Sequence, residues 1–429
     1  MRLGGRLQAA IEVLEDIETR KRPASDALKD WGLSHRFAGA GDRAVIGNIV
    51  YDALRRRQSL AWRMDSDSAR HIAYGVLLSD AELSNEAIEE MLAGDKFAPA
   101  PIEAVQLENW QTRQLSQAPD FVRADVPEWC VPHFEAVFGD DWIAEAAALG
   151  DRPPVDLRVN TLKANRDKVL KELARAGAVA APLLGSAMRI APLRAMGRHP
   201  NVQAEPAFQR GLFEVQDLGS QLAAKLANVQ PGQQVLDYCA GAGGKTLAMA
   251  ADMGNKGQIH AFDAERARLA PIFDRLKRAG VRNTQPHASI GDLAQFERQM
   301  DLVLVDAPCT GSGTWRRRPD AKWRLSEQQL ERRMVEQRDV LEAAKAYVKP
   351  SGRLVYITCS LFAAENARQV SVFLENNADF TPVDTQPRWD EVVEADPSLR
   401  PLFRDGAAIL SPLATSTDGF FISVLRRGK

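Results

Sequence analysis

Two apolar runs of strand type constrain the fold of this chain more than any other feature. The run LVLVDAP leads directly into Cys309, and the run LVYIT leads directly into Cys359. In an open parallel sheet the carboxyl ends of the strands form the ligand crevice, so we expect both thiols to face one site. Either cysteine alone would more often be a small buried residue. Two cysteines in matching contexts favour a paired-thiol site.

The order of patterns along the chain predicts the domains. Helical segments alternate with the apolar runs, and FFISVLRR adds a late strand, which indicates an α/β fold with a doubly wound, Rossmann-like sheet. Upstream, RLQAAIEVLEDIE and DRAVIGNIVYDALRRR carry apolar residues at helical spacing. VDLRVNTLK, a helix near 166–176 and MRIAP then indicate a small α/β unit. We expect an all-α domain over 1–130, a small α/β domain over 131–212 and the catalytic domain over 213–429.

A glycine-rich turn opens at a third cysteine, Cys239, in the segment QVLDYCAGAGGKT. Gly241, Gly243 and Gly244 let the backbone approach a ligand closely, which suits a nucleotide-like cofactor. Thr246 stands where the dinucleotide fingerprint needs its last glycine, so hydride transfer is disfavoured. A phosphate-binding GxxxxGKT loop would need a glycine where this chain has Cys239. Nucleotide hydrolysis through GGKT therefore stays as an alternative only.

An acidic residue follows the next apolar run, QIHAFDA, about twenty residues after the glycines. At this place the carboxylate of Asp263 can accept hydrogen bonds from ribose hydroxyls. It can also cap the helix that we expect near Ala264. The order of strand, glycine turn, helix, strand and acid suits S-adenosylmethionine as readily as a dinucleotide, so the cysteines must decide the cofactor.

At these motifs the chain resembles the NOP2/Sun RNA cytosine-5 methyltransferases, and among them the bacterial 16S ribosomal RNA methyltransferase B group. The resemblance runs from FEVQDLGSQLAA through CAGAGGKT, DAPCTGSGT, RRRPDAKW and YITCS to TDGFFISVL, about half the chain. The family usually has CAAPGGKT, so Gly241 and Ala242 depart from its pattern. Upstream, the helical part resembles the family's NusB-like RNA-binding domain, and the small α/β unit resembles its RRM-like insertion.

The resemblance implies a mechanism that agrees with the chemistry of the residues. Attack of a thiolate at C6 of cytosine makes C5 nucleophilic enough to take a methyl group from S-adenosylmethionine. The family's pattern makes Cys359 the attacking residue, and Cys309 the residue that assists C5 proton removal and product release. Asp306 would hydrogen-bond or protonate N3, which needs a raised pKa, and Lys245 would contact the cofactor or Asp306. The expected cofactor residues are Cys239, Ala240, Gly241, Ala242, Gly243, Gly244, Lys245, Asp263 and Asp306.

One cofactor contact of the family has no clear counterpart in this chain. The resemblance predicts an acid after the third strand that contacts the adenine amino group. Here that place holds His287, and the nearest acid is Asp292. The alternative for His287 is an ordinary surface or loop histidine. We leave the contact open between these two residues.

A basic segment after Cys309 is the candidate RNA contact. The formal net charge is only −2, so RNA binding must come from local patches. Guanidinium groups can neutralise phosphates, and aromatic rings can stack on unpaired bases. A solvated helix face is the alternative. The expected RNA-binding residues are Arg316, Arg317, Arg318, Lys322 and Trp323.

Composition agrees with a large enzyme of the cytoplasm. The 429 residues are 45% hydrophobic, enough for several buried cores. We find no membrane span, no signal peptide and no CxxC zinc pattern, and two reduced thiols suit a reducing compartment. We expect a monomer that uses S-adenosylmethionine, binds no metal and acts on RNA, with 16S ribosomal RNA as first choice and tRNA or another RNA as alternatives. A non-catalytic RNA-binding assembly factor is a further alternative, which predicts loss of a catalytic cysteine.

Overall fold

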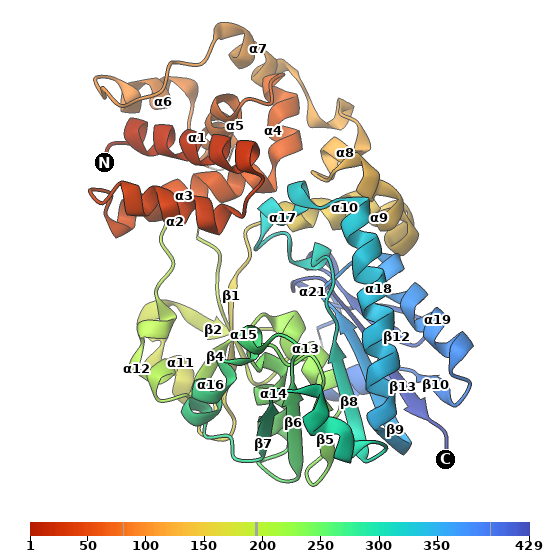
Figure 1. The fold of residues 1–429 in the computed structure, drawn as a ribbon. Coiled ribbons are helices and arrows are strands. Elements are labelled where there is room, and N and C mark those ends of the chain that lie inside the picture. The colour runs from red at the N-terminus through yellow and green to blue at the C-terminus, as the bar shows by residue number, and fades with distance from the viewer. Residues whose placement is uncertain (80, 194–195, 395) are drawn as a thin grey trace. The chain divides into compact units, whose positions relative to one another are not determined.

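The computed structural model describes residues 1–79, 81–193, 196–394 and 396–429, which form two compact units (Figure 1). The first unit comprises Met1–Pro153, Pro192–Pro200 and Thr314–Ser326. The second comprises Pro154–Ala191, Asn201–Gly313 and Glu327–Lys429. The first unit contains the helical domain expected over 1–130 and, by its contacts, the residues that follow up to Pro153, and the expected domain boundaries stay predictions. The small α/β part groups with the catalytic part by its contacts.

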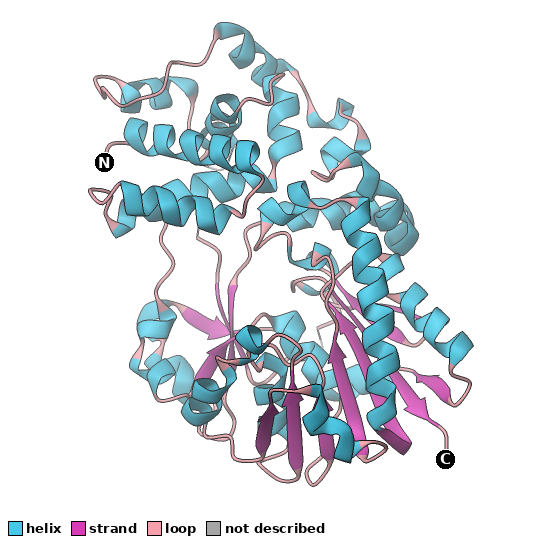
Figure 2. Cartoon of the chain, viewed as in Figure 1, coloured by secondary structure: helices cyan, strands magenta, loops and turns pink. Residues whose placement is uncertain are grey.

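The first unit is helical (Figure 2). Its helices are α1 (Leu3–Arg20), α2 (Ala24–Ser34), α3 (Ala40–Arg55), α4 (Arg57–Met64), α5 (Ala69–Ser79), α6 (Asn85–Leu92), α7 (Ala104–Thr112), α8 (Asp120–Arg123), α9 (Val131–Phe138), α10 (Trp142–Ala147) and α17 (Pro319–Arg324). Among the helices of the described ranges, none combines the length and apolarity that a membrane crossing needs.

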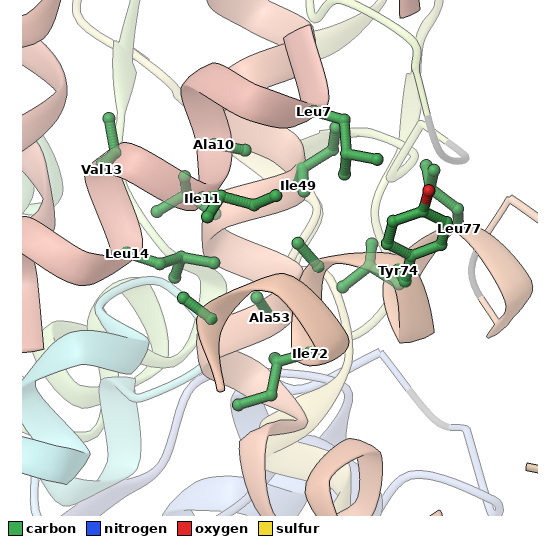
Figure 3. Packing of buried hydrophobic residues seen from close by; sticks show 14 of the residues in the cluster. Leu7, Ala10, Ile11, Val13, Leu14, Ile49, Ala53, Ile72, Tyr74 and Leu77 are labelled. Carbon is green, nitrogen blue, oxygen red and sulfur yellow. The ribbon is translucent and has the colours of Figure 1, made fainter. Parts of the chain in front are cut away.

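The core of this unit follows from the helical spacing of apolar residues. On α1, Leu7, Ile11 and Leu14 recur at three- and four-residue intervals and are buried on one face. They pack with residues of α3 and α5 such as Ile49 and Ile72 in one apolar cluster, as Figure 3 shows. The segment Thr314–Ser326 joins this unit through α17, which contacts α3.

Within the second unit, the small α/β part is a four-stranded antiparallel sheet in the order β2-β3-β1-β4. Its elements are β1 (Val155–Val159), α11 (Arg166–Glu172), β2 (Ala178–Ala180), β3 (Ala187–Ile190), α12 (Pro206–Gln209) and β4 (Phe213–Val215). Leu157, Met188 and Phe213 from three of these strands are fully buried and share a core with Val169 of α11. The strand β4 is the last strand of this sheet along the chain, so the sheet extends to residue 215.

The large sheet has nine strands, in the order β11-β12-β13-β9-β8-β5-β6-β7 with β10 beside β13. Five neighbouring strands run parallel to one another, in the spatial order β9, β8, β5, β6 and β7. The other four strands, β10, β11, β12 and β13, pair antiparallel. The strands are β5 (Gln234–Asp237), β6 (Gln258–Phe262), β7 (Thr284–His287), β8 (Met300–Asp306), β9 (Val348–Thr358), β10 (Phe380–Val383), β11 (Leu402–Arg404), β12 (Ala407–Leu410) and β13 (Phe420–Arg427). The predicted Rossmann-like α/β fold is confirmed.

Helices cover the sheet (Figure 2). They are α13 (Leu218–Leu226), α14 (Gly244–Asp252), α15 (Arg266–Leu269), α16 (Ile272–Ala279), α18 (Glu327–Ala344), α19 (Ala367–Asn376), α20 (Gln386–Val392) and α21 (Pro412–Thr415). Leu302 and Leu304 of β8 pack in one cluster with residues of α13 and α14, so the alternate residues Val303 and Val305 point to the opposite face. The strand order reverses between β5 and β8, which places the loops after these strands at the crevice of a doubly wound sheet.

Candidate active site

The two cysteines of the strand-ending motifs meet in the structure. Cys309 follows β8 and Cys359 follows β9, and these strands are parallel neighbours. Their sulfur atoms lie 3.4 Å apart, within hydrogen-bonding reach of each other. The bond to Cys359, burial and the charge of Cys359 all raise the pKa of the Cys309 thiol. Two thiols at this distance can divide two tasks on one substrate, one as nucleophile and the other as a proton-transfer group.

The third cysteine of the crevice has a different environment. Cys239 follows β5, the neighbour of β8 on its other side. Burial raises the pKa of the Cys239 thiol strongly, and the nearby Asp306, Asp237 and Asp263 carboxylates raise it further. Because the thiolate is the reactive form, Cys239 is a poor nucleophile at neutral pH.

An ion pair stands beside the paired thiols. Lys245, on the first turn of α14, donates a hydrogen bond of 2.6 Å from Nζ to Oδ2 of Asp306 at the end of β8. Burial lowers the pKa of Lys245, but the charge and hydrogen bond of Asp306 outweigh burial and raise it overall. The Cys359 sulfur adds to that rise, so the ammonium group and a Cys359 thiolate attract each other. Asp306 therefore accepts a hydrogen bond from Lys245, and the proton in this bond stays on the Lys245 ammonium group.

The glycine turn between β5 and α14 is tightly enclosed at one position. Gly243 has φ +83°, and a Cβ added there would lie 2.5 Å from Cγ1 of Ile272 on α16. Gly241 has φ +51° and donates its N–H to Oδ2 of Asp263 at 2.9 Å. Both positions have a left-handed backbone that favours glycine, and Gly243 also requires the missing side chain because Ile272 lies so close. The turn leads into the amino end of α14, whose first N–H groups favour negative or polar ligand atoms.

Asp263 orders the glycine turn. It is buried, and its other oxygen accepts the N–H of Glu265 at 2.9 Å, which caps the turn before α15. Each carboxylate oxygen can accept more than one hydrogen bond, so these contacts leave capacity for a ligand hydroxyl. The following helix begins at Arg266 with Glu265 at its N-cap and without a side-chain cap bond, so the expected capping of a helix near Ala264 by Asp263 is wrong, and the ribose contact stays a prediction.

Two buried acids escaped the sequence analysis. Asp237, the last residue of β5, accepts a hydrogen bond of 2.6 Å from the Thr246 hydroxyl, while its second oxygen is buried without a partner in the described structure. Burial raises the pKa of Asp237 to about 7. Glu365 lies fully buried beyond Cys359. Each acid interrupts an apolar segment of the sequence, in QVLDYCA and LFAAEN, which is the signal that could have revealed it.

The two candidates for the adenine contact have other partners. His287, at the end of β7, is buried and bonded to His260 of β6, with 2.9 Å between the ring nitrogens. Burial lowers the pKa of both histidines, that of His260 to about 4, so both rings are neutral at pH 7. Asp292 is an exposed residue that caps its own turn by accepting the Ser289 N–H. His287 is therefore a core residue rather than a loop histidine, and the adenine contact stays unassigned.

Much of the predicted RNA-binding segment is buried in the helical unit. Lys322 is only 1% exposed and donates a hydrogen bond of 3.0 Å to the carbonyl of Arg55 on α3. Trp323 donates its indole N–H to the Leu54 carbonyl at 2.6 Å, and Arg316 is also buried. The side chain of Lys322 cannot reach RNA in this conformation, and burial lowers its pKa to about 8. Arg318 is exposed and Arg317 is partly exposed, so only these two remain available for the expected phosphate contacts.

The part of the chain that the structure describes contains no group of side chains that could hold a metal ion. Among those residues, three or more His, Cys, Asp or Glu side chains do not gather around one point. None of the four cysteines forms a disulfide.

Comparisons with known proteins agree on one family. A family model described as 16S rRNA methyltransferase RsmB/F matches residues 224–426, and a model of the RsmF/B-like ferredoxin-like domain matches residues 126–192. The ribosomal RNA small subunit methyltransferase B of Citrobacter koseri is 29% identical over 408 residues, 90% of either chain. The crystal structure of the protein PH0851 is similar over 100% of both chains, with 26% identity and a TM-score of 0.73. That of a methyltransferase homologue from Pyrococcus horikoshii covers 72% of this chain and 97% of its own, with 28% identity and a TM-score of 0.59.

Proposed function

This chain belongs to the RsmB/F family of 16S ribosomal RNA methyltransferases, and we propose that it methylates C5 of a cytosine in RNA through a covalent adduct with Cys359. The observation that carries the proposal is the pair of thiols 3.4 Å apart at the ends of neighbouring strands. Methylation at a carbon that is a weak nucleophile needs such a covalent step, whereas methylation at nitrogen or oxygen does not.

The residues of the crevice suit S-adenosylmethionine, which when bound supplies an electrophilic methyl group. The turn from Cys239 to Gly244 offers backbone N–H groups, and the enclosed position of Gly243 keeps that backbone in place. Asp263 is positioned by its bond to Gly241 and would accept the ribose hydroxyls. The contacts of this turn are mostly backbone, so the departure from the family pattern at Gly241 and Ala242 is compatible with binding.

The thiolate of Cys359 begins the reaction by forming a carbon–sulfur bond at C6 of the cytosine. The electron pair of the C5–C6 double bond moves toward N3, which takes a proton, and C5 becomes the nucleophilic carbon of an enamine. C5 then forms a bond to the methyl carbon, whose bond to the cofactor sulfur breaks with its electron pair. Lys245 would stabilise the attacking thiolate, consistent with their mutual attraction.

The Lys245–Asp306 pair would supply the proton for N3. The resemblance predicts that Asp306 hydrogen-bonds or protonates N3, and in the structure this carboxylate accepts a hydrogen bond from Lys245. A carboxylate in that state can orient the base by accepting its exocyclic amino group, while the lysine side of the pair holds the proton. This arrangement also keeps the ammonium group close to where negative charge develops.

Cys309 would complete the cycle. Removal of the C5 proton returns its electron pair to the ring, restores the C5–C6 double bond and expels Cys359 as a thiolate, and the proton on N3 returns to Lys245. Cys309, a thiol during the attack, would first release its own proton to solvent, and its thiolate would then accept the C5 proton directly or through one water molecule. The distance of 3.4 Å between the sulfurs supports this division of roles, because it would let the two groups act at adjacent ring carbons.

The alternative functions have less support. Hydrolysis of a nucleotide through GGKT would use the Lys245 and Thr246 side chains, but these are bonded to Asp306 and Asp237. A non-catalytic assembly factor would not need two adjacent thiols. For the substrate, the family favours 16S ribosomal RNA over tRNA, and such a substrate would place the protein in the cytoplasm. The choice of cytosine would depend on residues around the crevice and on the helical and small α/β parts.

The test is methylation of 16S RNA by the purified protein with methyl-labelled S-adenosylmethionine, followed by bisulfite sequencing. We expect 5-methylcytosine from the unaltered protein and from Cys130→Ala, a control that removes a buried thiol of the helical unit. Cys359→Ala should lose methylation by at least about 10³-fold while S-adenosylmethionine binding, measured by calorimetry, stays within about threefold. Label in a different nucleotide, or turnover by Cys359→Ala, would refute the mechanism.

The Cys309→Ala protein gives the complementary result. Attack and methyl transfer remain possible without Cys309, but elimination is slowed, so a covalent protein–RNA adduct should accumulate. Denaturing gel electrophoresis would show the adduct as a band of reduced mobility. The double variant Cys309→Ala, Cys359→Ala is the matched control, since it lacks the attacking sulfur. An adduct that persists in the double variant would show that another residue attacks.

A further inference from the structure

Glu365 is a buried acid next to the thiols. It ends the short helical turn Ala363–Glu365, six positions after Cys359, and its side chain is fully buried. Burial raises the pKa of this carboxyl group above its ordinary value, and the donors that surround it oppose that rise without cancelling it. The structure records no ion pair for it among the described residues. An unpaired buried acid is costly for a fold, so its presence calls for a reason.

The carboxylate of Glu365 connects the two cysteine loops. One oxygen accepts the backbone N–H of Thr310 at 2.8 Å, and the other accepts the hydroxyl groups of Thr310 and Ser360, each at 2.5 Å. Thr310 directly follows Cys309, and Ser360 directly follows Cys359. Gln337 of α18 donates to the first oxygen at 3.0 Å and also to the carbonyl of Pro308 at 2.9 Å. The residues on both sides of Cys309 are therefore tied to the residue after Cys359.

Other hydrogen bonds already hold the two loops together, so a general brace is not the reason for the acid. The N–H of Gly313 bonds the carbonyl of Cys359 at 3.0 Å, and the N–H of Leu361 bonds the Ser312 hydroxyl at 2.8 Å. The hydroxyl groups of Ser312 and Ser360 add a bond of 3.0 Å between the loops. These contacts are neutral. Glu365 contributes a negative charge in addition, and that charge is among the causes that raise the pKa of Cys309.

We propose that Glu365 is a positioning residue, which fixes the separation of Cys309 and Cys359 and directs negative charge away from Cys309 toward the attacking sulfur. Two residues of opposite charge near the thiols make the two sulfurs differ in their negative charge. Lys245 attracts charge to Cys359, and Glu365 repels it from Cys309. Cys309 thus stays protonated while Cys359 attacks. This inference rests on the proposed covalent mechanism and assigns no contact between Glu365 and the substrate.

The decisive variant is Glu365→Gln, because glutamine keeps the shape and can still bond both hydroxyls once they rotate. We expect kcat to fall by about 10- to 100-fold with KM for RNA and for S-adenosylmethionine within about threefold. Single-turnover measurements should show slower formation of the Cys359 adduct. Glu365→Asp keeps the charge but is one methylene shorter, so it should not restore the rate. Glu375→Gln, the same change on an exposed part of α19, should match the unaltered protein.

Thr310→Val provides a second route if Glu365→Gln folds poorly. It removes one hydroxyl donor to the carboxylate and leaves the acid in place. We expect a fall in kcat of about three- to tenfold with an unchanged unfolding midpoint, because the separation of the thiols is then less well fixed. Wild-type kcat in a folded Glu365→Gln protein, or in Thr310→Val, would overturn the inference. If the unaltered protein forms neither 5-methylcytosine nor an adduct, the proposed function fails instead.

Discussion

Replacement of Gly243 by alanine tests whether the cofactor turn is built as the structure indicates. Alanine at φ +83° adopts a left-handed backbone, which costs about 1–2 kcal/mol. The new Cβ would also lie 2.5 Å from Cγ1 and 2.8 Å from Cδ1 of Ile272, a side chain that is fully buried and cannot move into solvent. Overpacking of this kind adds about 1–3 kcal/mol. We therefore expect Gly243→Ala to lower the free energy of unfolding by about 2–5 kcal/mol.

Gly254→Ala is the matched control. Gly254 also has a left-handed φ, +59°, but no described atom lies within 4 Å of an added Cβ. It should lose only the backbone part, about 1–2 kcal/mol, and should bind S-adenosylmethionine normally. Gly243→Ala should weaken that binding by about tenfold or more, because relief of the clash displaces the turn. Urea unfolding followed by circular dichroism, and calorimetric titration with the cofactor, measure the two quantities.

A double-variant cycle isolates the clash itself. Ile272→Ala removes both atoms that the new Cβ would meet. The double variant Gly243→Ala, Ile272→Ala should therefore lose less free energy of unfolding than the two single variants lose together, by at least about 1 kcal/mol. Equal losses in Gly243→Ala and Gly254→Ala, together with additive single losses, would refute the geometry described for this turn.

Three further predictions concern buried and exposed polar or aromatic side chains. Because burial raises the pKa of Asp237 to about 7 from 3.8, the folded protein keeps a proton that the unfolded chain releases, so stability should fall as pH rises from about 4 to 7. Asp237→Asn should remove about 3 kcal/mol of that pH dependence between pH 5 and 8, measured as urea midpoints at these two pH values, and an unchanged slope would contradict it. Trp323→Ala, which loses the bond to Leu54 and packing on the helical core, should destabilise the protein by about 2–4 kcal/mol without changing the salt dependence of RNA binding. Arg318→Ala should change RNA binding and leave stability unaltered. We expect a free energy of unfolding within about 0.5 kcal/mol of the unaltered protein, and a slope of log K against log salt that is smaller by about 1. A loss of stability without a change in this slope would exclude a phosphate contact.

The structure also changes how the RNA-binding role of the helical part must be tested. Deletion of the residues before about 118 would remove α3, and with it the carbonyls of Leu54 and Arg55 that accept hydrogen bonds from Trp323 and Lys322. The segment Thr314–Ser326 directly follows the loop that carries Cys309, so its release could disturb the thiols for reasons unrelated to RNA. Point changes on exposed residues such as Arg318 avoid this problem.

The sequence by itself determined the catalytic sheet and the meeting of the two thiols. Apolar runs with helices between them can bury both faces only as a doubly wound sheet, and a residue that follows such a strand lies at the carboxyl edge whatever the details of packing. Cys309 and Cys359 are therefore adjacent because β8 and β9 are neighbours. The glycine turn was likewise readable, because positive φ angles restrict the choice of residue locally.

Only the tertiary structure decided which polar side chains are buried and what they bond. Basic and aromatic residues after Cys309 have the same composition whether they face RNA or dock on a helix, and contact with α3 buried Lys322. The sequence also did not show which core the short helices after residue 130 pack against, because such helices carry too few apolar repeats. Glu365 became part of the site only when folding brought Thr310, Ser360 and Gln337 around one carboxylate, since hydrogen bonds between distant segments leave no periodic trace in a single sequence.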